Sequence, residues 1–382
     1  MVRLPELPFK TIDVGNEHPL VQEALRQRKP YEVCWCGSGR KFKKCHRFRE
    51  QESALSLGQM LDEQGRVFWK NRGCMHLNAS AHICAGKVVD AHTIQRKGPL
   101  QMIIGSDNHV CHLTPSPGEQ FIIEELGWRK ASTFPGYCAK HDTEIFGVLE
   151  RSTFTGTHEQ CVLQAYRNVC NELYKKRALI ESLEYQRIAI DRGCDLDAQI
   201  ARQLSVSASI AGHMKSKDEL ETLWRKFEDA IARQQYDRFL SKCYFFKGDL
   251  SVTSSGTLHT EFDFQGKLLM DMWNLETDAE MLSHSIMVTD DGGAIVFTWL
   301  ADEMLPPSVV STFDQVADDS KGDIFVQYCF LNCENTYFSK EWWEGLNSSR
   351  QEQLKRYAET LFYEGGTFVA NDDRLVKWNF QP

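Results

Sequence analysis

The spacing of apolar residues predicts that the middle of the chain is helical. Between residues 158 and 241 there is no proline, and the only glycines are Gly193 and Gly212. Large side chains recur there at three- and four-residue steps, which is the periodicity of an amphipathic helix. We expect a first helix that ends near Gly193 and a second that starts at about Ala198. The first repeat comprises Leu163, Tyr166, Cys170, Leu173, Arg177 and Ile180, and the second comprises Leu220, Leu223, Trp224, Phe227 and Ile231.

The pattern changes after Tyr244, where β-branched and aromatic residues predict strands. The stretches SVTSSGTLHTEFDF, SIMVTDDGGAIVFTWL and DIFVQYCFL have this composition, and residues 290–293 predict a hairpin turn. The segment FVQYCFLNC is expected to be a buried strand followed by its turn. Residues 349–352, Ser-Arg-Gln-Glu, form a capping-box pattern that predicts the start of a late helix at Ser349.

Length and composition limit the class of protein. The chain has 382 residues, of which 42% are hydrophobic and 25% are charged. That length gives room for about two or three domains, and these fractions exclude an overall disordered chain, a collagen-like repeat and a small disulfide scaffold. No apolar run approaches the roughly 20 residues of a membrane span, and the start MVRLPELPFKTIDVG lacks the apolar core of a signal peptide. We therefore expect a cytoplasmic protein that does not bind membranes.

The 13 cysteines are the unusual feature of the composition. Reducing surroundings disfavour disulfides, so clustered cysteines are expected to bind metal and scattered ones to pack in cores. The scattered set comprises Cys111, Cys161, Cys170, Cys194, Cys243, Cys329 and Cys333.

The first cysteine cluster has the spacing of a zinc knuckle. Cys34, Cys36, Cys45 and His46 place four ligands close together, and the Gly-Ser-Gly turn at 37–39 lets the backbone fold back toward an ion. The segment CWCGSGRKFKKCH resembles the SEC-C motif, an element at the C-terminus of the SecA translocation ATPase, whose usual form is CPCGSGKKYKKCH. The resemblance implies that these four residues bind Zn²⁺, which would supply the folding energy of so short a fragment.

Basic residues surround this knuckle. Between Arg26 and Arg49 there are nine Lys and Arg against one acid, Glu32, in a chain whose net charge is −9. Three interpretations remain open: contact with nucleic-acid phosphates, contact with an acidic protein surface, and a solvated surface without a partner. The second corresponds to the role of the SEC-C element in the export ATPase, where it engages a chaperone.

A second set of Cys and His predicts another zinc site, assembled from two separate pieces of chain. Cys84-Ala-Gly precedes a β-rich stretch, 87–92, that ends on a histidine, and Cys138-x-x-His141 opens a helical run. Cys74 and Cys84, closed by Cys138 and His141, would complete four ligands. The alternative is that these cysteines are scattered residues of the core.

This order resembles the HNH endonuclease family, in which a ββα-metal module is built on a treble-clef zinc core. The resemblance implies that His92 is the general base that activates water, and that Asp142 with Asp90 holds a catalytic Mg²⁺ or Mn²⁺. Asn108 is the best candidate for the middle Asn of the family. The chain departs from the family pattern because its first cysteine pair is ten residues apart, and because His76 competes with that pair for the metal.

Two further features have open alternatives. The apolar stripe of the helical middle is expected to pack inside the chain, and a homodimer seam is the alternative. Trp342 and Trp343 are expected to anchor a helix on a sheet, and a stacking platform for nucleic-acid bases is the alternative.

Together these patterns predict an α+β multidomain protein in four segments. They are a SEC-C zinc-binding segment at 1–60, an HNH-like ββα-metal (treble-clef) domain at 61–155, a helical domain at 156–243 and an α+β domain of unknown role at 244–382. The function expected is metal-dependent endonucleolytic cleavage of nucleic acid, in an architecture that resembles effectors of defence against foreign DNA. The alternative is a non-catalytic adaptor with two structural zinc sites, which binds a protein or nucleic-acid partner through the basic SEC-C segment.

Overall fold

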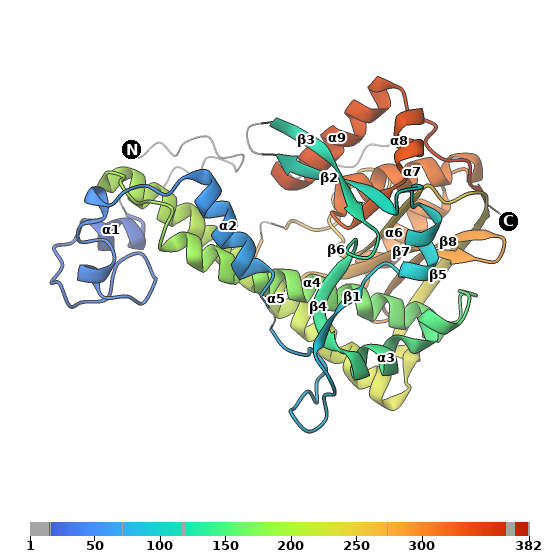
Figure 1. The fold of residues 1–382 in the computed structure, drawn as a ribbon, viewed down its shortest axis with the longest axis horizontal. Coiled ribbons are helices and arrows are strands. Elements are labelled where there is room, and N and C mark those ends of the chain that lie inside the picture. Colours follow the sequence, from blue (N-terminus) through green and yellow to red (C-terminus); the bar gives the residue numbers. More distant parts are fainter. Residues whose placement is uncertain are drawn as a thin grey trace. The chain divides into compact units, whose positions relative to one another are not determined.

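The computed structural model describes residues 15, 17–70, 72–116, 119–272, 274–363 and 371–380. Residues 1–14, for which the sequence predicts no signal peptide, lie outside them. The described residues form a mixture of helices and strands, which confirms the expected mixed composition (Figure 1). No described helix is long and apolar enough to cross a membrane.

Contacts within the chain divide it into two compact units. The first comprises Met1–Lys70 and Tyr174–Asp218, and the second comprises Asn71–Leu173 and Glu219–Pro382. The divisions fall inside two long helices, because the N-terminal knuckle packs on the end of one and on the beginning of the other. The four segments predicted from the sequence follow different boundaries.

The first unit consists of short N-terminal elements and parts of the two long helices. The predicted helices of the middle are confirmed as α4 (His158–Arg187) and α5 (Leu196–Arg233). Gly193 lies in the turn between them with φ +74°, and a Cβ there would lie 2.9 Å from the carbonyl oxygen of Glu52, so the turn requires glycine. The other elements are α1 (Pro19–Leu25), the 3-10 turns η1 (Phe42–Lys44) and η2 (Arg49–Gln51), and α2 (Leu57–Phe68).

The second unit is built on an eight-stranded sheet in which paired neighbours are antiparallel. β7 and β8 form the hairpin predicted at residues 290–293, with Thr289 opposite Gly292. β2 and β3 come from the predicted nuclease segment, yet β2 pairs with β9 and so extends the sheet of the C-terminal segment. In spatial order the strands are β10 (Asn379–Phe380), β5 (Phe239–Lys247), β8 (Gly292–Leu300), β7 (Met281–Thr289), β6 (Val252–His259), β9 (Thr336–Phe338), β2 (His109–Ser116) and β3 (Glu119–Gly127).

A separate two-stranded sheet precedes α3 (Ala139–Arg151). β1 (Val88–His92) pairs antiparallel with β4 (Thr133–Cys138), and Val88 lies opposite Cys138. α3 follows β4 directly, so the end of β4 and the first turn of α3 are held in one place. This small β1–β4–α3 unit carries the second group of candidate metal ligands.

The remaining helices pack against the large sheet (Figure 1). Phe313 of α6 and Phe325 of α7 meet Phe297 of β8 in one aromatic core, with ring centroids 5.4 to 5.8 Å apart. The stretch DIFVQYCFL is part of α7, and its prediction as a strand is wrong, because a helix buried on nearly all sides shows no amphipathic period. The elements are α6 (Leu305–Asp314), α7 (Asp318–Asn332), α8 (Lys340–Gly345) and α9 (Ser348–Tyr363), with the helical turns η3 (Arg96–Leu100) and η4 (Tyr236–Arg238).

Two smaller predictions concern the C-terminal helices. The side chain of Asn347 accepts a hydrogen bond of 2.9 Å from the N–H of Arg350, so Asn347 caps α9 in place of the predicted Ser349. Trp343 is buried and stacks on Phe338 of β9, with ring centroids 5.0 Å apart, which confirms that it anchors α8 on the sheet.

The cysteines predicted to pack in cores are free of disulfides, and most of them are buried. Cys194 and Cys243 are the half-buried members of this set. The buried members are Cys111, Cys161, Cys170, Cys329 and Cys333.

α4 carries polar residues into the interior of the second unit. Asn168 is fully buried, and its amide donates hydrogen bonds of 2.9 and 3.0 Å to the hydroxyls of Ser283 and Ser285 on β7. Between these serines His284 is also buried. Its Nε2 lies 3.1 Å from the hydroxyl of Ser254, and its Nδ1 has no partner among the described residues. Burial lowers the pKa of His284 to about 3.

We expect acid to destabilise the second unit through His284. The unfolded chain takes up a proton at this side chain near pH 6.5, whereas the folded chain does so near pH 3, so the free energy of unfolding falls as the pH drops between these values. The loss from one such group is about 2 kcal/mol between pH 7 and pH 5. Urea unfolding at both pH values should show this loss, and a smaller one in the variant His284→Gln, whose amide can still bond to Ser254. An equal pH dependence in the two proteins would contradict this expectation.

Candidate metal centres

Tight turns in the N-terminal segment position the first Cys/His group. Cys34 and Cys36 lie in the loop before η1, and Cys45 follows η1 as its C-terminal cap. Gly37 and Gly39 have φ values of +81° and +69°, which turn the chain back toward the cysteines. The Gly-Ser-Gly segment therefore has the role expected from the sequence.

Three thiols and one imidazole converge in this loop. The Sγ atoms of Cys36 and Cys45 are 3.6 Å apart, and Nδ1 of His46 lies 3.2 Å from Sγ of Cys34 and 3.2 Å from Sγ of Cys45. The four ligand atoms lie within 4.8 Å of one another, and all four residues are buried. A tetrahedral zinc ion with Zn–S bonds of about 2.3 Å places two sulfurs about 3.8 Å apart. The donor set and its spacing therefore fit zinc.

A buried carboxylate orients the histidine of this group. Nε2 of His46 lies 2.7 Å from Oδ2 of Asp191, in the turn between α4 and α5. Gln203 donates a hydrogen bond of 2.7 Å to the same oxygen, and Nε of Arg49 lies 3.1 Å from Oδ1. Burial acts to lower the pKa of His46, but its hydrogen bonds to Asp191 and to the thiols outweigh burial and raise the pKa to about 11. Asp191 accepts the hydrogen bond of Nε2–H, so Nδ1 is the nitrogen that faces the sulfurs and that would bind a metal once its own proton has left.

The knuckle is part of the interior of the first unit. The guanidinium of Arg187 donates hydrogen bonds to the backbone carbonyl of Cys36 and, at 2.9 Å, to the hydroxyl of Ser207 on α5. Trp35 and the cysteines share an apolar cluster with Ile200 of α5. The metal-binding loop and the two long helices therefore pack as one body within this unit.

The second Cys/His group joins the loop before β1 to the start of α3. Cys74 and Cys84 lie in that loop, Cys138 ends β4, and His141 lies in the first turn of α3. Nδ1 of His141 lies 3.3 Å from Sγ of Cys74, 3.3 Å from Sγ of Cys138 and 3.8 Å from Sγ of Cys84. The four ligand atoms lie within 4.8 Å of one another, so this group also fits a metal ion. His76 stacks on His141, with ring centroids 4.1 Å apart, and is not one of the four.

The start of α3 stabilises a thiolate in the second group. Burial acts to raise the pKa of Cys138, but hydrogen bonds from the backbone of His141 and Ala85 help to lower it overall. Burial raises the pKa of Cys74 to about 11. Because the thiolate is the form that binds metal, Cys138 is better prepared to bind it than Cys74 is.

The predicted catalytic residues His92 and Asp142 belong to the same β1–β4–α3 unit, but His92 lies opposite Thr133, at the other end of β1 from the pair Val88–Cys138. His92 ends β1, Asp142 follows His141 in α3, and both side chains are half-buried. Burial lowers the pKa of His92 to about 4, and the charges of Arg96 and Arg167 act in the same direction. Burial raises the pKa of Asp142, and the charge of Arg167 opposes this rise.

One ion pair from neighbouring helices acts on both of these residues. Nη1 of Arg167, on α4, lies 2.9 Å from Oε1 of Glu150, on α3, and the side chain of Arg167 is almost completely buried. The charges of Arg167 and Glu150 each affect the pKa of His92 and the pKa of Asp142. The two predicted catalytic side chains therefore lie within electrostatic reach of the same pair.

Asp90 and Asn108, the other two predicted catalytic residues, are both exposed. Asp90 is exposed on β1. Asn108 is exposed in the turn before β2, with φ +64°, and its N–H donates a hydrogen bond of 3.0 Å to the carbonyl of Gly105, so its evident role is in the turn. Among the described residues, the two Cys/His groups are the only places where three or more potential ligands lie within 4.8 Å of one another. His92, Asp90 and Asp142 therefore do not form a third such group.

Sequence reasoning missed the residues that support both sites. The sequence contains a pattern that could have indicated a buried Arg167. This residue lies four positions after Leu163 and three before Cys170, on the apolar side of the predicted helix. No sequence pattern could have indicated the role of Asp191, because 145 residues separate it from His46 and no spacing rule connects them.

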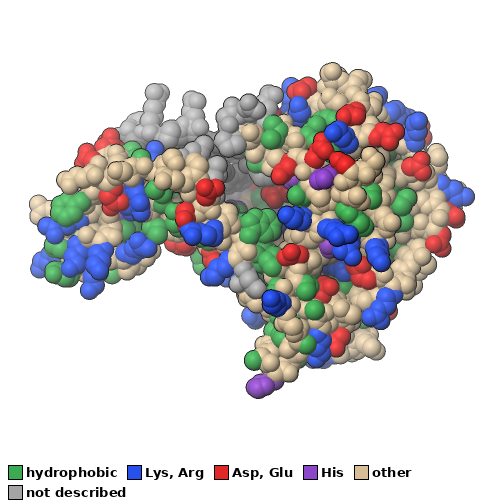
Figure 2. Space-filling view, in the orientation of Figure 1, with side chains coloured by type: hydrophobic (Ala, Val, Ile, Leu, Met, Phe, Trp, Pro, Cys, Tyr) green, Lys and Arg blue, Asp and Glu red, His purple; other side chains and the backbone are tan. Residues whose placement is uncertain are grey.

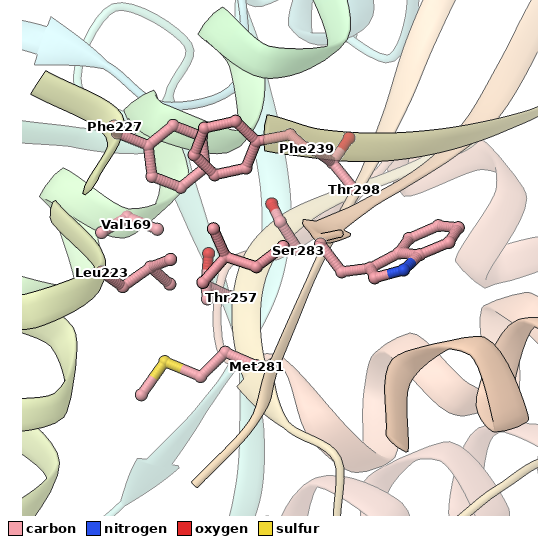
Figure 3. Close-up of a pocket in the computed structure, with 10 residues that line it drawn as sticks. Val169, Leu223, Phe227, Phe239, Thr257, Met281, Ser283 and Thr298 are labelled. Atoms are coloured by element: carbon pink, nitrogen blue, oxygen red, sulfur yellow. The ribbon is translucent and has the colours of Figure 1, made fainter. Parts of the chain in front are cut away.

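A small pocket in the second unit coincides with neither group (Figure 3). It lies between α4, α5 and the sheet, and its volume of about 10 Å³ leaves room for about one water molecule. None of the predicted site residues lines it. The lining residues are Val169, Leu223, Phe227, Phe239, Thr257, Met281, Ser283, Thr298, Trp299 and Leu300.

The two groups define a protein with two sites, each of three cysteines and one histidine, that could hold metal ions. The first site belongs to a known motif, because the family model of the SEC-C motif matches residues 32–47 and so confirms that resemblance. No curated protein and no solved structure matches the chain. The HNH-like domain stays a prediction.

We expect elemental analysis to find close to two zinc ions per chain, since each group supplies four suitable donors. The double variant Cys34→Ser, Cys36→Ser should hold close to one ion. The matched control Cys194→Ser, Cys243→Ser, which alters two half-buried cysteines outside both groups, should keep two. A content near one zinc ion per chain in the unmodified protein would show that the second group does not hold zinc.

We expect Asp191→Asn to weaken zinc binding at the first site by about 10- to 100-fold, because a neutral amide holds the imidazole of His46 less firmly than a carboxylate does. Zinc release to a competing chelator measures this affinity. The control Asp197→Asn changes an exposed acid at the start of α5 and should release zinc as the unmodified protein does. Equal release from all three proteins would show that Asp191 does not support the site.

Proposed function

We propose that the protein is a metal-dependent endonuclease whose active site lies on the β1–β4–α3 unit. The order of its parts is similar to that of the HNH family: a cysteine loop, then two strands, then a helix with ligands on its first turn. The observation that carries the proposal is that His92 and Asp142 belong to one β1–β4–α3 unit and lie within electrostatic reach of the same Arg167–Glu150 ion pair.

The side chains present fit a catalytic divalent cation. Asp142 offers a carboxylate oxygen, and Nε2 of His92 is buried and has no partner among the described residues. Mg²⁺ is commonly held by one or two carboxylates together with substrate phosphates, so fewer than three protein ligands are sufficient. A bound Mg²⁺ or Mn²⁺ would supply positive charge that stabilises the transition state and the leaving oxygen.

His92, Asp142 and the Arg167–Glu150 pair have protonation states that suit proton transfer from an attacking water. With a pKa of about 4, His92 is neutral near pH 7 and can accept a proton from an attacking water. Burial raises the pKa of Asp142, and the charge of Arg167 opposes this rise and so acts toward the ionised form, which is the form that holds a cation. Glu150 pairs with Arg167 and so limits the net positive charge beside His92.

We expect purified protein to cleave plasmid DNA or RNA in the presence of Mg²⁺ or Mn²⁺, and His92→Ala to lower the cleavage rate by about 100- to 10,000-fold, the usual contribution of a general base. Asp142→Asn should lower the rate as well and should raise the metal concentration required. The assay measures nicked and linear products over time in zinc-replete buffer.

The matched control is His112→Ala, because His112 pairs with Glu124 on the large sheet and is not placed in the proposed site. Its cleavage rate should equal that of the unmodified protein. Absence of cleavage with every metal, or equal cleavage by His92→Ala, would rule out the nuclease. The alternative is then the non-catalytic adaptor, which two structural metal sites would also support.

A further inference from the structure

The basic residues around the SEC-C motif fall into two sets. In the first set, guanidinium groups are paired inside the first unit. Arg26 Nη2 lies 2.9 Å from Glu32 Oε2, Arg28 pairs with Glu23, and Arg49 Nε lies 3.1 Å from an oxygen of Asp191. Each of these cations is already paired with a carboxylate of the same chain, and the side chains of Arg28 and Arg49 are buried as well.

The second set is open to solvent. Its members are exposed or half-buried, and no described acidic residue lies within ion-pair distance of them. Figure 2 shows Lys and Arg side chains gathered on the part of the first unit that carries α1. The members of this set are Lys29, Arg40, Lys41, Lys43, Lys44 and Arg47.

Two exposed aromatic rings lie among these cations. Tyr31 is 68% exposed, and Nζ of Lys43 lies 3.9 Å from its ring centroid. Phe48 is 53% exposed, and the guanidinium carbon of Arg47 lies 5.0 Å from its ring centroid. Exposed rings beside cations are the combination that binds single-stranded nucleic acid, because bases stack on the rings while phosphates contact the charges.

The metal group holds this surface in place. Lys43 and Lys44 belong to η1, which ends on the ligand Cys45, and a single β-bridge pairs Lys41 with Val33, next to the ligand Cys34. The backbone of the cations is therefore anchored to two of the four ligands. A surface arranged before binding loses less conformational freedom when a partner binds.

We propose that the SEC-C segment binds single-stranded nucleic acid, with phosphates at Arg40, Lys41 and Lys44 and a base stacked on Tyr31. An acidic protein would satisfy the charges equally well, but it would not require the two aromatic rings. DNA and RNA share the phosphates and bases that this surface recognises. The inference goes beyond the proposed nuclease, since binding here does not depend on cleavage.

The test is fluorescence anisotropy with labelled 20-nucleotide oligo(dT) and oligo(rU). The protein is the full chain with His92→Ala, loaded with zinc and free of Mg²⁺, so that binding is measured without cleavage. Arg40→Glu, Lys41→Glu and Lys44→Glu together should weaken binding at least tenfold and make the slope of log K against log salt shallower by about 2. The control Lys247→Glu, Lys267→Glu, Lys377→Glu makes the same change of charge on the second unit and should bind within about twofold of the parent.

A second pair of variants tests the aromatic contact. Tyr31→Ala should weaken binding about tenfold, whereas Tyr31→Phe should not, because stacking needs the ring and not the hydroxyl. Zinc content must stay the same in all variants, which shows that the knuckle is intact. Unchanged binding after charge reversal, equal binding by Tyr31→Ala and Tyr31→Phe, or displacement of the oligonucleotide by an equal charge of polyglutamate would each overturn the proposal.

Discussion

The contact between His46 and Asp191 is the interaction on which the first unit depends. A motif of so few residues has little core of its own, and its four ligands hold only a short loop. The carboxylate connects this loop to the turn between the two longest helices; Gln203 also donates a hydrogen bond to Oδ2, and Arg49 forms an ion pair with Oδ1. Because loss of one of these groups would leave another buried polar group without its partner, we expect the motif and the helices to stabilise each other.

The second site relies on α4 in a different way. Its four ligands come from the loop before β1, from the end of β4 and from the first turn of α3, and none comes from α4. What α4 provides is Arg167, a nearly fully buried cation beside His92 and Asp142. The turn at the end of α4 thus supports the first metal group, and Arg167 within α4 affects the pKa values of His92 and Asp142 in the second unit. Two buried polar residues of α4, which an apolar stripe alone would not require, are explained in this way: Arg167 by its pairing with Glu150 and Asn168 by its hydrogen bonds to β7.

The ligands could be predicted from the sequence because zinc requires particular atoms at short spacing. Cys34, Cys36, Cys45 and His46 are neighbours in the chain, and Cys138 with His141 has helical spacing, so local rules were sufficient for these six residues, whereas no local spacing connects them to Cys74 and Cys84. The long helices and the β7–β8 hairpin followed from periodicity and turn residues for the same reason. The strand predicted within α7 was wrong because burial on all sides removes the pattern that separates helix from strand. The pairing of β2 with β9 and the position of Asp191 depend on distant parts of the chain, which no local rule describes.

The ligands are separated by different lengths of chain in the two metal groups, so a bound ion would contribute differently to the free energy of unfolding in each. Within the first group, Cys34 and His46 are 12 residues apart, whereas His141 is 57 residues from Cys84 and 67 from Cys74. An ion in the second group would therefore act as a cross-link that closes a long loop containing β2 and β3, and it would restrict the unfolded chain by about 1 kcal/mol more than an ion in the first. It would do for these strands what a disulfide does, without needing an oxidant, and its removal would destabilise the fold partly by enlarging the ensemble of unfolded conformations.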